Sequence, residues 1–486
     1  MAPGCKEELC SDYVMLKPEG AAASFSGFLK FLFSSGGLKT GDFFDSPAET
    51  DTGRLRFHTR FLVLVSVIVK NVLIYLKAPL AWLGSSLEIF LNYPSFNGGY
   101  VRLILNFLTG SMVRPETTSE NFRSFLAILD NRVDFDPDIK NGDSRYTPLF
   151  SIMAAKLSYE NKAFVQKVIT NNWKMEFLEF KNFHSDNAED KSTQAIMLQD
   201  KSDDPNLVVV AFRGTEPFSA DDLRTDADLS WYKIEGVGRI HAGFMRALGL
   251  RKNNVRPNGI ERGPDMTELA YYEIKEKLRE IISVNKNAKF ILTGHSLGGA
   301  LSILFAAVLA MEEEDGLLGR LEGIYTFGQP RVGDVEFGKF VGENLLRKYG
   351  VRYFRYVYAN DIVPRVPYDD EANFFRHFGP CLYYNSFYHG KVLEEEPNMN
   401  YFSLLWMIPK KFNALFEVMR GFMLPWIFGE DYREGWVLII CRIIGIMFTG
   451  LIDHGFQDYV NLIRLGTPPA SLHFPEPAQQ QCLKCD

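Results

Sequence analysis

Ser296 is the residue of this chain best placed to do chemistry, because it lies in the run Gly294-His295-Ser296-Leu297-Gly298. A serine in a sharp turn between a strand and a helix projects its hydroxyl from the sheet edge, and glycines beside it let neighbouring backbones approach. The first N–H groups of such a helix stabilise a developing oxyanion. We therefore predict that Gly294, His295 and Gly298 form a nucleophile turn and that Ser296 attacks a carbonyl carbon. A surface turn without chemistry is the alternative.

The segments around this turn alternate between strand and helix patterns. A short apolar run at 289–293 precedes the serine, and apolar residues at helical spacing follow it: Leu301, Leu304, Phe305 and Val308. Further strands are predicted at 207–212, 323–327 and 353–358. This alternation predicts an α/β fold with a mostly parallel central sheet and helices on both faces.

An acid and a histidine would complete such a site. Asp361 directly follows the predicted strand 353–358, at the sheet edge where catalytic groups collect, and prolines stiffen its loop. The chain order serine, acid, histidine leaves four histidines after it: His377, His389, His454 and His473. We favour His454, with His389 second, because His454 precedes a last short helix. Its ring would take the Ser296 proton while Asp361 holds the other nitrogen. We expect His295 to be a packing residue.

An oxyanion hole requires two donors. Leu297, the residue after the nucleophile, supplies one backbone N–H. Thr215 leaves the predicted strand 207–212 at the same edge and offers a second N–H and a hydroxyl. The carboxylates that follow are interpreted as a solvated face rather than as metal ligands: Asp221, Asp222, Asp226 and Asp228. The sequence predicts neither a metal nor a cofactor.

Composition limits the classes of function. The chain has 486 residues, of which 46% are hydrophobic and 23% charged, enough for a full core and more than one module. Its 53 basic and 60 acidic residues give a net charge of −7, and no basic stripe is present, which argues against nucleic acid as a partner. The 6 cysteines do not form a disulfide framework, so we expect a reducing compartment.

Two further segments, 60–93 and 401–451, are rich in aromatic and aliphatic residues. Lysines and a proline interrupt the first too early for a membrane span. We interpret it as a helix lying in a lipid interface, with these contact residues: Phe61, Leu64, Ile68 and Trp82. Prolines and charges divide the second into short pieces, which we expect to form an apolar mouth or lid. For both segments, a layer packed on the catalytic domain is the alternative.

The chain accordingly divides into four parts. Residues 1–55 are expected to be poorly ordered, and 56–144 to form an apolar helical lipid-association region. Residues 145–465 are expected to form the catalytic domain, with an apolar insertion at about 400–451. Residues 466–486 are expected to be a tail.

Five motifs, in order, resemble those of class 3 lipases, the α/β-hydrolases that include fungal triacylglycerol lipases. They are Phe212-Arg213-Gly214-Thr215, His241-Ala242-Gly243-Phe244, residues 294–299, residues 326–334 and Asn360-Asp361-Ile362-Val363-Pro364. The resemblance covers about 207–465, and the flanking apolar segments resemble the plant branch associated with seed and pollen oil bodies. It implies an α/β-hydrolase fold, a triad of Ser296, Asp361 and His454, and an oxyanion hole of Thr215 and Leu297.

The expected protein is a serine lipase that hydrolyses long-chain acylglycerols through an acyl-enzyme intermediate, on the cytosolic face of a lipid droplet (oil body) or membrane. Triacylglycerol is the expected substrate, and we expect the enzyme to hydrolyse di- and monoacylglycerol as well. The sequence is compatible with a homo-oligomer. A phospholipase or galactolipase, or an acyltransferase, would use the same residues. An inactive droplet-coating scaffold is the alternative from another class. The acidic segment after Thr215 differs from the amphipathic lid of compact fungal members, so we expect the apolar insertion to act as the lid.

Overall fold

The computed structural model describes residues 10–16, 33, 44–45, 57–183, 193–200, 207–250, 269–367, 375–397 and 401–468. Most of the predicted N-terminal region 1–55 lies outside these residues, as does the predicted tail beyond residue 468, with His473.

A central sheet of eight strands organises the catalytic domain, in the order β12-β11-β10-β9-β8-β5-β4-β3. The strands are β3 (Glu176–Phe183), β4 (Thr193–Asp200), β5 (Leu207–Phe212), β8 (Lys289–His295), β9 (Leu321–Phe327), β10 (Arg352–Tyr358), β11 (Cys381–Tyr384) and β12 (Gly390–Leu393). The five strands from β5 to β11 pair in parallel, and antiparallel strands flank them at both edges. The predicted mostly parallel α/β sheet is confirmed.

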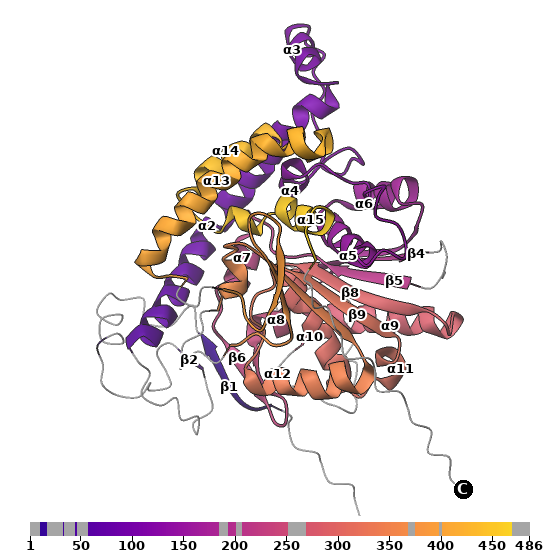
Figure 1. The fold of residues 1–486 in the computed structure, drawn as a ribbon, viewed down its shortest axis with the longest axis vertical. Coiled ribbons are helices and arrows are strands. Elements are labelled where there is room, and N and C mark those ends of the chain that lie inside the picture. The colour runs from indigo at the N-terminus through magenta and orange to yellow at the C-terminus, as the bar shows by residue number, and fades with distance from the viewer. Residues whose placement is uncertain are drawn as a thin grey trace, which may run out of the picture.

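Helices cover both faces of this sheet because its central strands are apolar on both sides. In β5, Val208 and Val210 belong to one core, and Val209 and Ala211 belong to the other. The first core includes residues of α8 (Ala242–Ala247), α9 (Ala270–Val284), α10 (Leu297–Met311) and α12 (Val335–Val341). The second includes residues of α5 (Tyr146–Leu157), α6 (Lys162–Lys167) and α15 (Phe456–Arg464). This two-sided layering is that of the expected α/β-hydrolase fold (Figure 1).

Smaller elements complete the domain. A second sheet of four strands has the order β2-β1-β6-β7, with β1 (Cys10–Leu16), β2 (Phe44–Asp45), β6 (Trp231–Ile234) and β7 (Gly238–His241). Short α-helices are α4 (Phe125–Leu129), α7 (Ala220–Asp226) and α11 (Asp315–Leu318). Single π-helical turns are η2 (Val168–Asn172) and η3 (Gly342–Arg347), and 3₁₀ turns are η4 (Val363–Arg365), η5 (Glu430–Tyr432) and η6 (Ile452–His454).

Four apolar helices lie outside these layers: α2 (Phe57–Phe96), α3 (Tyr100–Leu108), α13 (Leu404–Phe428) and α14 (Trp436–Gly445). The expected interruptions by proline are wrong. Helix α2 continues through Pro79 and α13 through Pro409. A proline inside a helix costs about 3 kcal/mol, and both prolines lie at exposed positions of their helices. Among the described residues, Val63–Phe96 is the stretch whose length and composition would suffice to cross a membrane.

A buried cluster of charges holds α13 and α14 on the catalytic domain. Asp458 of α15 pairs with Arg420 of α13 at 2.6 Å and with Arg442 of α14 at 3.0 Å. Arg442 also binds Glu434 through two hydrogen bonds of 2.7 Å, and all four side chains are buried. The apolar insertion is thereby fixed through its inner face, while its outer face stays exposed.

Arg442→Ala should lower the free energy of unfolding by about 3–5 kcal/mol, because it leaves the carboxylates of Glu434 and Asp458 buried without this counter-charge. Chemical denaturation monitored by tryptophan fluorescence measures the change. Arg433→Ala is the matched control, since the Arg433–Glu430 pair is largely exposed and its loss should leave stability unchanged. Equal effects of the two variants would contradict this account of the cluster.

Candidate active site

Ser296 occupies a strained turn between β8 and α10, with φ of 58° and ψ of −131°. Two flanking glycines make the turn fit. A Cβ on Gly294 would lie 2.1 Å from the carbonyl carbon of Gly298, and a Cβ on Gly298 would lie 2.2 Å from the Phe212 oxygen. Neither position tolerates a side chain, so the glycines predicted around Ser296 are required by the close approach of β5, β8 and α10.

Asp361 and His454 lie together although 93 residues separate them in the chain. His454 Nδ1 donates to Asp361 Oδ2 at 2.7 Å, and Asp361 is fully buried at the end of β10. The other contacts of the carboxylate are also donors: Tyr459 Oη at 2.6 Å and the Val363 N–H at 2.8 Å. Three donors around one carboxylate fix its orientation. Asp361 can therefore hold the His454 ring and stabilise it when it becomes protonated.

The second ring nitrogen of His454 is available as a base. Nδ1 carries the hydrogen that it donates in the bond to Asp361, so Nε2 carries a lone pair. This Nε2 is buried and has no hydrogen-bond partner among the described residues. The backbone of His454 is held by His295 of the nucleophile turn, whose Nε2 donates to the His454 carbonyl oxygen at 2.7 Å.

His295 is a packing residue whose tautomer the structure defines. Because its Nε2 donates to a carbonyl, its Nδ1 must accept, and the Tyr159 hydroxyl donates to it at 3.2 Å. The two imidazole rings of His295 and His454 lie 4.3 Å apart. Burial and the neighbouring His454 hold the pKa of His295 well below its ordinary value, so it stays neutral. It serves as a fixed neutral support under the His454 backbone.

The loop after β5 lies directly against the nucleophile. A Cβ on Gly214 would come within 3.0 Å of the Ser296 Cβ and within 2.3 Å of the His295 oxygen. The next residue, Thr215, donates its hydroxyl to Asp226 at 2.7 Å. Burial raises the pKa of Asp226 to about 7. The structure therefore brings Thr215, Leu297 and Ser296 to one sheet edge, and it fixes the Thr215 side chain through a carboxylate of α7.

The interpretation of the acidic segment as a solvated face is wrong. Asp222 and Asp228 are buried at 2% and 1% exposure, because each bonds groups inside the protein. Asp222 accepts the Glu216 N–H at 3.0 Å, and Asp228 pairs with Lys70 at 3.1 Å. Within the described part of the chain, no group of three or more acidic, histidine or cysteine side chains is arranged to hold a metal ion.

Sequence reasoning missed other contributors to this site: Asp226, Tyr459 and Gly328. Gly328 has a φ of +59°, and a Cβ on it would lie 2.7 Å from His454 Cε1 and 2.8 Å from Asp361 Oδ2. It leaves room for the imidazole–carboxylate pair. Gly328 directly follows β9 within the motif 326–334, so the sequence contained an indication of its role. No local pattern around Tyr459 indicated that it contacts Asp361.

The remaining histidines lie elsewhere. His389, the second choice, is exposed and forms a β-bridge with Thr467. His377 Nε2 bonds the Pro364 carbonyl oxygen at 2.6 Å. Of the described histidines after Asp361, His454 is the one that contacts the acid.

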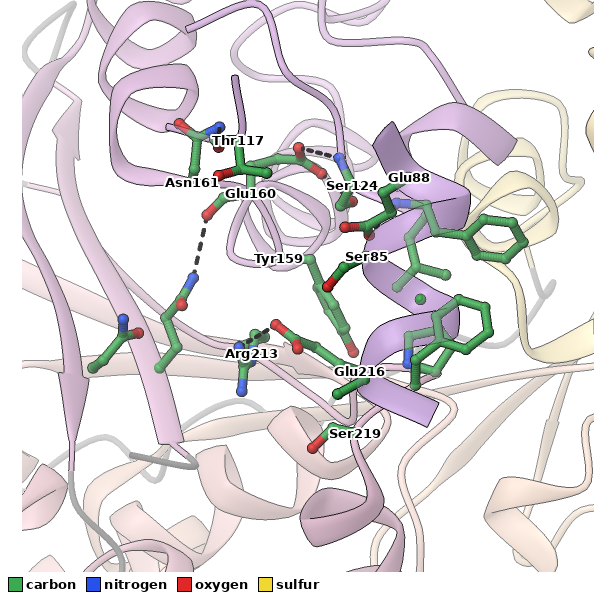
Figure 2. Close-up of a pocket in the computed structure, with 18 of the residues that line it drawn as sticks. Ser85, Glu88, Thr117, Ser124, Tyr159, Glu160, Asn161, Arg213, Glu216 and Ser219 are labelled. Carbon is green, nitrogen blue, oxygen red and sulfur yellow. Dashed lines mark hydrogen bonds and ion pairs between the residues drawn. The ribbon is translucent and has the colours of Figure 1, made fainter. Parts of the chain in front are cut away.

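A cavity of about 750 Å³ opens behind the Thr215 loop. Figure 2 shows Arg213 and Glu216 on one side of it, Ser85 and Glu88 of α2 on another, and Tyr159 between them. Its walls come from α2, from the chain around α4, and from the loop that leads to α7. Helix α2 therefore reaches the neighbourhood of the active site.

Comparison with known proteins follows the same motifs. The family described as Lipase (class 3) matches residues 209–371. The triacylglycerol lipase OBL1 of Nicotiana tabacum is 38% identical over 87% of this chain and 86% of its own length. This chain belongs to the class 3 lipase family. The lipase OBL1 of Arabidopsis thaliana is 39% identical over 84% of the chain and 85% of its own length.

A solved structure, the lipase from Rhizopus microsporus var. chinensis, is 22% identical with a TM-score of 0.37. It covers 53% of this chain, and the match covers 77% of that lipase. The order and direction of the strands in its own central sheet define the fold of this class 3 lipase.

Asp226→Asn should change how stability depends on pH. The folded chain holds the Asp226 proton to a pH of about 7, whereas the ordinary pKa of 3.8 applies after unfolding. The native protein therefore loses stability as pH rises from about 4 to about 7, by at most about 1.4 kcal/mol per pH unit. Asparagine cannot ionise, so the midpoint of thermal unfolding of D226N should rise relative to native across that interval.

Asp221→Asn, on the same short helix but partly exposed, is the control and should show no such gain. Parallel pH curves for D226N and the native lipase would contradict the assignment of a buried, protonated carboxyl.

Proposed function

We propose that this class 3 lipase hydrolyses triacylglycerol, with Ser296 as nucleophile, His454 as general base and Asp361 as its partner. The 2.7 Å bond between His454 Nδ1 and Asp361 carries the proposal, because it leaves a buried, unpartnered His454 Nε2 beside the nucleophile turn. The curated relatives covering most of the chain carry the name triacylglycerol lipase. Their names support the choice of substrate.

The reaction has two halves. Ser296 Oγ attacks the ester carbonyl carbon while His454 Nε2 takes its proton, and the carbonyl oxygen becomes an oxyanion bound by the Leu297 N–H and by Thr215. The C–O bond then breaks, and the departing diacylglycerol oxygen takes the proton from His454. In the second half, a water loses a proton to His454 and attacks the acyl-serine. Fatty acid leaves, and the proton returns to Ser296.

The exposed apolar helices support a lipid surface as the place of reaction. In the view of Figure 1, α2, α13 and α14 run along the same side of the molecule, and α3 projects past them. Trp82 of α2 is 71% exposed and Trp426 of α13 is 90% exposed. Of the predicted lipid-contact residues, Phe61 and Ile68 are also exposed, and Leu64 is partly buried. Monomeric soluble proteins seldom expose apolar area of this extent.

These helices form one connected surface, which we call the apolar layer: α2, α3, α13 and α14. Helix α13 packs on α14, α2 packs on α3, and Trp436 of α14 donates to the Tyr100 hydroxyl of α3 at 2.8 Å. Their inner faces carry the polar groups that bind the catalytic domain. A monolayer-covered droplet on the cytosolic side accepts such a surface without a spanning segment. We propose an oil body or similar droplet as the location.

Ser296→Ala should abolish release of fatty acid from triolein, with a loss of at least about 10⁴-fold, because no other group replaces the nucleophile. The measurement is fatty-acid release by the purified lipase from triolein, phosphatidylcholine and monogalactosyldiacylglycerol emulsions. Unchanged turnover in S296A would sink the serine mechanism and favour the coating scaffold. Faster release from phospholipid or galactolipid would change the substrate, and acyl transfer to an added alcohol in preference to water would make the enzyme an acyltransferase.

A triple variant with Trp82, Phe412 and Trp426 changed to serine should bind lipid droplets far less well. Each buried aromatic side chain contributes about 1.5–3 kcal/mol on entering an apolar phase, so partitioning should fall by at least about 100-fold. Flotation with triolein droplets coated by phospholipid measures it. Val284→Ser, which changes an 85% exposed apolar residue on α9, is the control and should float like the native lipase. Undiminished flotation of the triple variant would refute the apolar layer as the lipid contact.

A further inference from the structure

Helix α7 lies between the apolar layer and the oxyanion loop, and its two sides bind different parts of the protein. It starts five residues after Thr215, and it packs along α2 (Figure 1). This is the acidic segment that stands where compact fungal lipases carry a lid. If α7 stays in place, the oxyanion hole is preformed; if α7 moves, the hole must be assembled during the reaction.

One side of α7 and the residues after it are fixed to α2. Lys70 pairs with Asp228 at 3.1 Å, and both side chains are more than nine-tenths buried. Ser66, one turn earlier on α2, donates its hydroxyl to the Ala227 carbonyl oxygen. Seven residues later, Lys77 pairs with Asp221 at 2.9 Å. Polar groups at 66, 70 and 77 thus form one stripe of α2 that faces α7.

The other side of α7 holds the oxyanion loop. Asp226 accepts the Thr215 hydroxyl at 2.7 Å. Asp222 accepts the Glu216 N–H at 3.0 Å and lies 3.6 Å from an Arg213 nitrogen. The three residues 213, 215 and 216 of this loop are therefore oriented by two carboxylates of one helix. A shift of α7 would move both carboxylates together.

The α2 end of α7 is built to be rigid. Asp228 accepts the Ser230 N–H at 3.0 Å and pairs with Arg246 of α8 as well as with Lys70. Further along α2, Gly84 lies so close to Phe218 that a Cβ there would be 2.6 Å from the phenylalanine Cβ. Figure 2 shows Ser85 and Glu88 of α2 lining the same cavity as Glu216 and Ser219 of the loop. A movement of α7 away from α2 would break the buried ion pair between Lys70 and Asp228.

We infer that Lys70 is a positioning residue for the reaction: through Asp228 it holds α7 against α2, and α7 in turn fixes Thr215 through its side chain, which places the Thr215 backbone N–H in the oxyanion hole. The inference rests on the proposed function, in which Thr215 binds the oxyanion. It assigns the lipid-facing helix a second role inside the active site. The oxyanion hole is preformed, and the segment after Thr215 does not open as a lid.

The test compares kcat on a water-soluble ester, p-nitrophenyl butyrate, for the full-length lipase without lipid. Active sites are titrated with a p-nitrophenyl phosphonate that reacts at Ser296, so kcat is counted per working site. Lys70→Met should lower kcat at least about 10-fold with little change in KM, because the binding of the oxyanion is lost in the transition state only. Lys70→Arg should restore most of it. Asp228 keeps Arg246 as a counter-charge in both variants, which favours folding.

Lys275→Met is the matched control. Lys275 of α9 is similarly buried and pairs at 2.7 Å with Glu312, which caps the far end of α10, about 24 Å along that helix from Ser296. It should lower thermal stability but leave kcat per titrated site unchanged. If K70M behaves like K275M, Lys70 is only structural and the inference is overturned.

A double-mutant cycle identifies the route. Thr215→Val removes the hydroxyl that binds Asp226 and should lower kcat at least about 10-fold. Adding K70M to T215V should cost less than about 2-fold more, because the link through which Lys70 positions the Thr215 N–H is already broken. Full additivity would overturn the inference. A harmless T215V would show that the bond to Asp226 does not position the loop, and it would also overturn the inference. If K70M yields no titratable sites, Ser66→Ala is measured in its place. This variant removes only the hydrogen bond from Ser66 to the Ala227 carbonyl oxygen and must also lower kcat. An unchanged kcat in S66A overturns the inference.

Discussion

The hydrogen bond between His454 and Asp361 joins parts of the chain 93 residues apart, and the rest of the structure is arranged so that it can form. The intervening chain contains β11, β12, α13 and α14. It must leave the sheet edge, cross the surface and return His454 to the carboxylate. Asp453, the residue before the histidine, accepts the Asn360 N–H at 2.9 Å, which closes this long loop beside the acid. The buried charges around Asp458 fix the returning helix α15 a few residues later.

Those features of the active site that depend on local sequence could be predicted. Apolar runs marked the central strands, and the glycines around Ser296 marked the turn, since strand, turn and helix need only neighbouring residues to be recognised. The edge of a parallel sheet indicated Asp361, whereas chain order left four histidines. The position of His454 before a last short helix and the resemblance to class 3 lipases favoured it, and the structure supplies its contact with Asp361.

Features that depend on tertiary contact could not be predicted. A carboxylate looks the same in sequence whether it faces water or a buried lysine. The pattern therefore predicts a solvated Asp228, because its partner Lys70 is far away in the sequence. Gly328 and Tyr459 shape the acid–histidine pair from segments with no pattern of their own. Helix propensity alone predicts interruptions at Pro79 and Pro409, whereas α2 and α13 continue through them.

The inner faces of the apolar helices also set the order of events when the protein is made. Helix α13 carries Lys410, Glu417 and Arg420 on its buried side. A charged residue at the centre of a membrane helix costs about 2.5–3.5 kcal/mol, so an emerging α13 is a poor substrate for insertion into a bilayer. The charges must first find Tyr401, Tyr358 and Asp458 within the folded domain. Folding in water therefore precedes contact with lipid. The apolar layer forms only when the domain has folded.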